Sequence, residues 1–132
     1  MFVEFFLEVL FIKIKVKGYL ENIGKNTKET IDTLGIKNKY NVIYNYNNIK
    51  HKIIFNKKNI LLVRENEEFI HNFNFELSKE TDSEYYIKEY STNIDVPIIT
   101  NKLNISDNSI EIEYLIKETN EQYRFVLEMS DK

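Results

Sequence analysis

The 132-residue sequence contains no cysteine, only three glycines and a single proline. Without cysteine the chain cannot form disulfides, thiolate zinc sites or cysteine nucleophiles, which agrees with a reducing compartment and leads us to expect a cytoplasmic protein. The scarcity of glycine and proline excludes collagen-like repeats and low-complexity disorder. Eighteen basic and 21 acidic side chains give a net charge of −3, so no cationic field exists to attract nucleic acid or a membrane surface. We expect neither of these partners.

Long hydrophobic runs are also missing. Residues 2–11 are largely apolar, but Glu4 and Glu8 interrupt them, and neither a basic residue before them nor a small-residue cleavage site after them suggests a signal peptide. No unbroken apolar span of about 18 residues develops, which excludes a transmembrane helix. We expect one domain over residues 1–132, in which residues 1–11 form an apolar amino-terminal extension. This extension is either a short helix or the start of the first strand, and its Phe and Val content favours the strand. Its apolar side chains should be buried on the domain or against a second copy.

The hydrophobic pattern of the remaining chain has a period of two. Residues 12–17 alternate strictly between apolar and basic, which is typical of a strand with one buried face. Residues 110–114 and 123–129 repeat this rhythm. Two aromatic strands are predicted, one over residues 40–46 with Tyr40, Val42, Tyr44 and Tyr46 on one face, the other over residues 69–77 with Phe69, Phe73, Phe75 and Leu77 aligned. Weaker strands are predicted over residues 28–34, 49–55, 60–64, 85–91 and 94–105, which brings the number to about ten.

Short polar clusters separate these runs, among them Asn47-Asn48 and Asp107-Asn108. Separators of hairpin length make consecutive strands antiparallel neighbours, and no capped helical repeat intervenes that could carry a parallel crossover. A flat meander of this size would expose two long edges, which closure into a barrel removes. The sequence therefore predicts an all-β fold, an antiparallel meander of about 8–10 strands closed into a β-barrel.

Six stretches in this strand pattern resemble the YwiB-like family, bacterial domains of unknown function with a calycin-like (lipocalin-like) β-barrel fold. They are Val16–Tyr19, Asn41–Tyr46, Leu62–Arg64, Glu89–Thr92, Ile99–Leu103 and Ile110–Tyr114. The resemblance covers most of the chain from Val16 onward and implies a calycin-like barrel without an established activity. The family usually has a glycine soon after the arginine that corresponds to Arg64. Here Glu65-Asn66 follows, so we expect Asn66 to supply a positive φ in that turn.

Two histidines, His51 and His71, lie on otherwise apolar strand faces. Imidazoles that face the inside of a barrel could bind a ligand. A buried or rim histidine that is satisfied by a neighbour is the favoured interpretation, because a metal site needs three or four ligands and no further His or Cys is present. We expect no metal and no cofactor.

Arg64 and Arg124 are the two arginines of the chain. Arg64 continues the strand face of Ile60 and Leu62, and a guanidinium inside a barrel must be paired or must meet a carboxylate or phosphate of a ligand. Its structural partner would be a carboxylate such as Glu89 or Glu113. Arg124 alternates with aromatic neighbours and should face outward.

Motifs of catalysis and of nucleic-acid recognition are absent from the sequence. Tyr40, Tyr44 and Tyr46 could form a stacking platform for single-stranded nucleic acid, but their surroundings are rich in asparagine and the chain is acidic, so they fit a core or a barrel mouth better. No nucleophile elbow, phosphate-binding loop or HExxH motif occurs. We predict that the protein is not an enzyme and has no catalytic residues.

If the meander closes, the inward faces bring six candidate site residues to a common interior: Tyr44, His51, Arg64, His71, Phe73 and Tyr114. Apolar walls with a few polar groups suit one small, largely apolar or amphiphilic acid. The first hypothesis, by analogy of fold, is therefore a ligand-binding barrel. The alternative is a protein-interaction or self-association module, such as a homodimer, with a packed core and no ligand. An enzyme that uses His51 or His71 as a base ranks third.

Overall fold

The computed structural model describes residues 10–132, which form ten β-strands and no helix. The strands are β1 (Ile12–Asn22), β2 (Thr27–Lys37), β3 (Asn41–Tyr46), β4 (Ile49–Phe55), β5 (Ile60–Glu65), β6 (Phe69–Phe75), β7 (Glu80–Ile87), β8 (Thr92–Ile105), β9 (Ser109–Ile116) and β10 (Glu121–Asp131). Each strand pairs antiparallel with the next, and β1 pairs with β10, which closes the sheet. The prediction of an all-β antiparallel barrel is confirmed. Within residues 10–132, no helix is long and apolar enough to cross a lipid bilayer.

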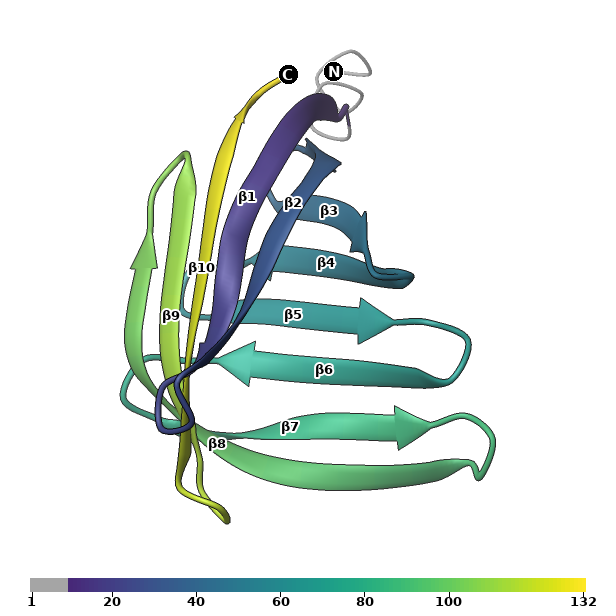
Figure 1. Cartoon of the computed structure of the whole chain (residues 1–132), viewed down its shortest axis with the longest axis vertical. Helices are drawn as coiled ribbons and strands as arrows, with labels where there is room; N and C mark the ends of the chain where they lie inside the picture. The colour runs from purple at the N-terminus through teal and green to yellow at the C-terminus, as the bar shows by residue number, and fades with distance from the viewer. Residues whose placement is uncertain (1–9) are drawn as a thin grey trace.

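The barrel has two groups of strands that run in different directions (Figure 1). Strands β1, β2, β9 and β10 follow the long axis of the molecule, and β3 to β7 lie across it. Strand β8 has 14 residues, pairs with β7 at one end and β9 at the other, and carries a register shift between Thr100 and Lys102. Such a bulge bends a strand, which lets β8 pass from one group to the other.

The barrel closes unevenly between β2 and β3. Strand β2 pairs with β1 along all eleven of its residues, but with β3 only from Gly35 to Lys37. Residues 27–34 of β2 therefore have a strand partner on one side only. This gap lies beside the ends of β3 and β4 that carry the Asn47-Asn48 turn.

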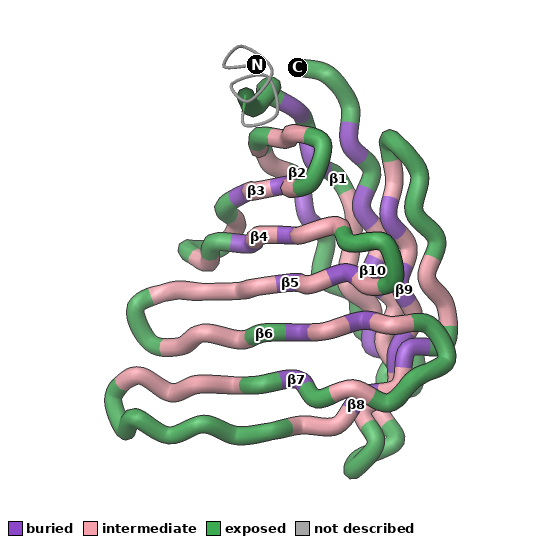
Figure 2. Tube along the Cα trace, turned by 180° about the vertical axis from the view of Figure 1, so that it is seen from behind, coloured by how far each residue is buried: buried purple, intermediate pink, exposed green. Residues whose placement is uncertain are grey.

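Buried residues recur at alternate positions along several strands (Figure 2), and their side chains form the core of the barrel. Val16, Val42, Ile60, Ile98, Ile110, Ile112 and Leu127 are fully buried, and burial of one such side chain stabilises a fold by roughly 1.5–3 kcal/mol. Gly18 marks the closest approach of two strands, because a Cβ there would overlap the carbonyl oxygen of Val126. The barrel needs glycine at this position of β1.

Asparagine side chains and backbones shape several turns. Asn47 and Asn48 have φ angles of 53° and 61°, the left-handed pair that a two-residue type I′ hairpin requires. Asn66 does not adopt a positive φ, so that expectation is wrong. Its Oδ1 instead accepts hydrogen bonds from the backbone amides of Glu68 (2.8 Å) and Phe69 (3.0 Å). An Asx turn therefore shapes the connection between β5 and β6.

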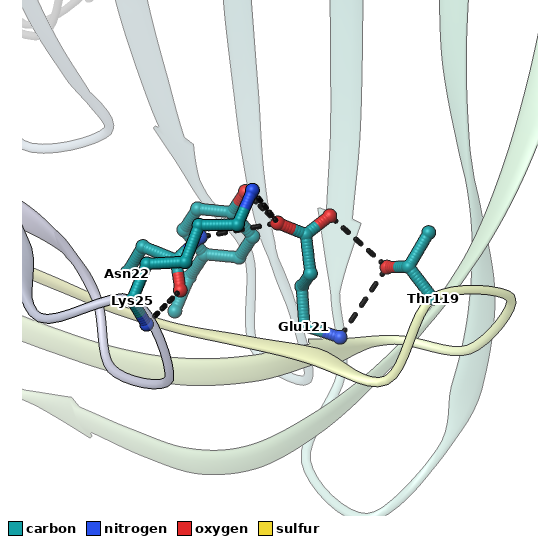
Figure 3. Close-up of polar contacts among 5 residues, drawn as sticks. Asn22, Lys25, Thr119 and Glu121 are labelled. Atoms are coloured by element: carbon teal, nitrogen blue, oxygen red, sulfur yellow. Dashed lines mark hydrogen bonds and ion pairs between the residues drawn. The ribbon is translucent and has the colours of Figure 1, made fainter.

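The β1–β2 and β9–β10 turns are joined through Glu121 (Figure 3). Its carboxylate accepts hydrogen bonds from Asn22 Nδ2 (3.1 Å) and Thr119 Oγ1 (3.1 Å) and lies 3.4 Å from Lys25 Nζ. The pKa of the Glu121 carboxyl is lowered, first by the hydrogen bond from Thr119 and then by that from Asn22. These contacts fix both turns at the same end of the barrel.

Several strand boundaries differ from the sequence prediction, and three of the differences misplace predicted residues. Strand β7 spans Glu80–Ile87 rather than 85–91, because the chain turns at residues 88–91, with Ser91 at a φ of 48°. Strand β6 ends at Phe75, and Leu77, expected on its inner face, is 48% exposed. Tyr40, expected on the face of β3, precedes that strand and is also exposed.

The amino-terminal prediction is tested only where the structure describes the chain. Strand β1 begins at Ile12, so the expected strand does not include Leu10 and Phe11. Residues 1–9 lie outside the described residues. The expectation that they are buried on the barrel or against a second copy stays a prediction.

Candidate functional site

One row of side chains crosses the inner surface of five neighbouring strands. Each member is the direct cross-strand partner of the next. In order across the sheet, they are Tyr44 on β3, His51 on β4, Arg64 on β5, His71 on β6 and Tyr85 on β7. Direct partners on one face of a sheet have Cβ atoms about 4.5–5.5 Å apart. The row is therefore continuous, with the guanidinium at its centre, an imidazole on either side and a tyrosine beyond each imidazole.

Aromatic ring contacts stabilise the side chains on both sides of Arg64. The rings of Tyr44 and His51 stack with centroids 4.6 Å apart and planes 6° apart. His71 meets the Tyr85 ring edge-on at 5.1 Å, and its Nε2 lies 2.7 Å from Ser83 Oγ. His71 is thus satisfied by a neighbour, as the favoured interpretation of the histidines required.

Arg64 has no counter-ion in the part of the chain that the structure describes. Among residues 10–132, no ion pair and no hydrogen bond joins its guanidinium to another side chain. Glu113, one proposed partner, lies 3.6 Å from Lys102 Nζ and 3.3 Å from a guanidinium nitrogen of Arg124. Glu89, the other, is exposed in the turn between β7 and β8. The predicted structural pair is wrong for both carboxylates.

Arg124 shows the contrasting environment outside the barrel. It alternates with buried Phe125 and contacts the carboxylates of Glu113 and Glu21, the latter at 3.7 Å. The prediction that Arg124 faces outward is confirmed. One arginine is thus paired on the outer surface, whereas the other, on the inner surface, has no ion pair with any described residue.

A cavity of about 40 Å³ lies beside the row in the barrel interior. Its walls are Leu20, Glu29, Ile31, Tyr46, His51, Leu62, Arg64, Phe73, Phe75, Tyr114 and Phe125. Four of the six predicted site residues line it: His51, Arg64, Phe73 and Tyr114. The other two, Tyr44 and His71, do not line it, but Tyr44 stacks on His51 and His71 contacts Phe73 at a centroid distance of 4.0 Å.

The volume of the cavity limits what can enter it. Sites for drug-sized ligands have volumes of roughly 300–1,000 Å³, whereas this cavity holds about 40 Å³. That space accepts a carboxylate-sized group and does not accept a long alkyl chain.

The electrostatics of the site favour a negative charge. Burial lowers the pKa of His51 to about 4, with a second contribution from Arg64, and the same two causes lower the pKa of His71 to about 4. Both imidazoles are therefore neutral at pH 7. Burial raises the pKa values of Tyr44 and Tyr114, whose phenols stay protonated. Arg64 is left as the cation of the row, and the buried Tyr44 hydroxyl has no hydrogen-bond partner.

Three polar side chains of the site were missed as site residues by sequence reasoning. Tyr85 completes the row but was assigned to the first position of a weak strand, because inward Ser83 breaks the apolar alternation of β7. Glu29 lines the cavity and has the same strand parity as buried Ile31, which was the available signal. Tyr46 was recognised as part of an inner face but not as a wall of the cavity. Among the described residues, no group of three or more His, Asp or Glu side chains is arranged to hold a metal ion.

Comparisons with known proteins supply the fold and no chemistry. No family model matches the chain, and no curated protein matches it. Among solved structures, the crystal structure of the ywiB protein from Bacillus subtilis superposes with a TM-score of 0.67, covering 92% of each chain at 14% sequence identity. The two chains share a fold, and at this identity the likeness concerns the fold alone.

Proposed function

We propose that the barrel binds one small organic acid, whose anionic group is held by Arg64 between His51 and His71. The proposal also places the chain with YwiB-like, calycin-like barrels and treats it as a binding protein rather than an enzyme. The observation that carries it is the inward-facing Arg64 guanidinium, which has no counter-ion among residues 10–132 and lines a cavity.

An unpaired cation inside a barrel lowers stability unless water or a ligand satisfies it. A carboxylate can accept two parallel hydrogen bonds from a guanidinium, and this geometry is stronger than a contact between neutral groups. The aromatic walls of Phe73, Phe75 and Tyr114 would contact the apolar part of the acid. Because the cavity is small, we expect short acids to bind better than fatty acids.

The experiment compares the two arginines of the chain by thermal melts. Without ligand, we expect Arg64→Met to be as stable as the wild type or more stable, because the substitution removes a charge that has no protein partner. Arg124→Met is the matched control on the outer face and should be less stable, because it abandons Glu113 and Glu21.

The same melts are repeated with acetate, butyrate, hexanoate, benzoate and phosphate. Wild type and Arg124→Met should be stabilised by a short organic acid, and Arg64→Met should not respond. The proposal fails if no acid raises the melting temperature of the wild type, or if Arg64→Met responds as strongly as the wild type does.

Self-association is a second candidate function, and the outer surface of β2 favours it. Residues 27–34 of β2, which have a strand partner on one side only, end at Leu34, and Leu34 and nearby Ile36 are 54% and 37% exposed. An unpaired strand edge beside exposed apolar side chains can pair with another chain. Sedimentation of the full chain tests this candidate: a dimer that Leu34→Lys dissociates would support it, and a monomer at all concentrations would exclude it.

A further inference from the structure

We infer that the interior site selects acids that also carry an ammonium group, with Glu29 as the residue that determines this specificity. The inference rests on the proposed function, since it extends the same site. The ligand class is therefore small amino acids in the chemical sense, molecules with a carboxylate at one end and an ammonium at the other.

The geometry places one charge of each sign on a single cavity. Arg64 on β5 and Glu29 on β2 both line it, and Glu29 is the one carboxylate among its lining residues. The two groups do not form an ion pair, because no nitrogen–oxygen contact within 4.0 Å joins them. Glu29 Oε1 accepts a hydrogen bond from Asn47 Nδ2 at 3.4 Å, which holds the carboxylate at the gap between β2 and β3.

The pKa of Tyr44 is influenced by both charges. The buried Tyr44 hydroxyl lies in the field of both groups: Arg64 acts to lower its pKa and Glu29 acts to raise it, while burial dominates. This hydroxyl has no hydrogen-bond partner and belongs to a residue that is 1% exposed. A guanidinium and a carboxylate therefore line one small cavity without forming an ion pair, and Tyr44, which stacks on the cavity residue His51, has an unused hydroxyl outside its walls.

A molecule with two opposite charges would neutralise both ends of this cavity. The carboxylate would bind Arg64 and the ammonium would bind Glu29, at the exposed end where an ammonium keeps part of its hydration. A plain acid of the same shape would place a methyl group next to the Glu29 carboxylate. A cavity with apolar walls alone would bind the plain acid more tightly than the amino acid. Which of the two compounds binds more tightly therefore tests the role of Glu29.

The test uses two isosteric pairs of ligands, β-alanine with butyrate and γ-aminobutyrate with valerate. Their affinities for the full chain are measured by calorimetry on the wild type, Glu29→Gln and Asp32→Asn. Asp32 is the matched control, because it is an exposed carboxylate on the same strand with the opposite parity. In the wild type and in Asp32→Asn, we expect the amino acid of at least one pair to bind several-fold more tightly than its isostere. In Glu29→Gln this ratio should fall to one or below, while the plain acid keeps its affinity.

The outcomes separate this inference from the proposed function. If butyrate and valerate bind as tightly as their amino counterparts or more tightly, the inference is wrong and the acid-binding proposal stands. A preference for the amino acid that survives in Glu29→Gln also overturns the role of Glu29. If none of the four compounds binds, the inference is wrong, and the proposed function fails with it when no acid of the melting panel raises the melting temperature of the wild type.

Discussion

Two arginines in one chain show how the environment of a side chain decides its role. Arg124 shares the outer surface with Glu113 and Glu21, where solvent screens the ion pairs, so its contribution to stability is small. Arg64 occupies an inner position where no carboxylate of residues 10–132 lies within ion-pair distance, although Glu29 lines the same cavity. The neutral histidines on either side leave the charge of Arg64 uncompensated.

The histidines make stability depend on pH in a predictable direction. Their pKa is about 4 in the folded chain and about 6.5 in an unfolded chain, so between these values the unfolded state binds more protons. The stability that the neutral histidines contribute is therefore present above about pH 6.5, and it is lost as the pH falls toward 4. Between pH 7 and 5.5, the two groups together should lower the free energy of unfolding by about 2 kcal/mol.

Urea denaturation of the wild type and of the double variant His51→Gln/His71→Gln measures this effect. The residues that face the histidines are Arg64, Tyr44, Phe73, Ser83 and Tyr85, and none of them carries a carboxylate. The double variant should show a flatter dependence between pH 7 and 5.5. Equal slopes for both proteins would show that the buried imidazoles are not responsible.

The alternation of side chains along each strand predicted which residues face inward, but it did not predict which of them lie side by side across strands. Alternation from Leu62 to Arg64 was sufficient to place the guanidinium inside, and the same reasoning placed His51 and His71 there. The cross-strand register, which puts these three residues side by side, depends on turn lengths and bulges that the sequence does not encode locally. Tyr85 and Glu29 were missed because their strands alternate with polar inward residues.

At the scale of elements, the strands were predicted well where one face is continuously apolar. Strands β4 and β5 agree with their predicted ranges to within a residue. Strand β7 was displaced because Ser83 faces inward to meet His71, which hides the period of two. The turn at Asn66 was misjudged for another reason: asparagine can build a turn through its side chain as well as through a positive φ.

The β3–β4 hairpin gives a prediction for a single turn residue. Asn48 has a φ of 61°, and a β-branched residue in that conformation should cost roughly 1–2 kcal/mol. We expect Asn48→Val to lower the free energy of unfolding by about this amount, while Asn48→Gly, the matched control, keeps or raises it. Chemical denaturation measures both. Equal stability of the two variants would show that the hairpin does not depend on this conformation.

At the scale of the whole molecule, barrel closure was predictable and the size of the interior was not. Avoidance of open edges argued for closure, and the pairing of β1 with β10 provides it. The interior volume depends on how aromatic side chains from opposite strands meet, as Phe73, Phe75 and Tyr114 do with centroids 5.1–5.9 Å apart. These contacts fill most of the lumen and leave the small cavity beside Arg64.

The most direct measurement is a proton–nitrogen correlation NMR titration that observes the Arg64 guanidinium and the two imidazoles. The spectra are recorded on the full chain as β-alanine or butyrate is added, and Arg124 serves as the internal reference on the outer face. The account predicts a saturable shift of the Arg64 Nε–Hε signal, with smaller shifts of His51 and His71 and no shift of Arg124. Signals of Arg64 and both histidines that stay unchanged up to the solubility limit of both compounds would contradict it.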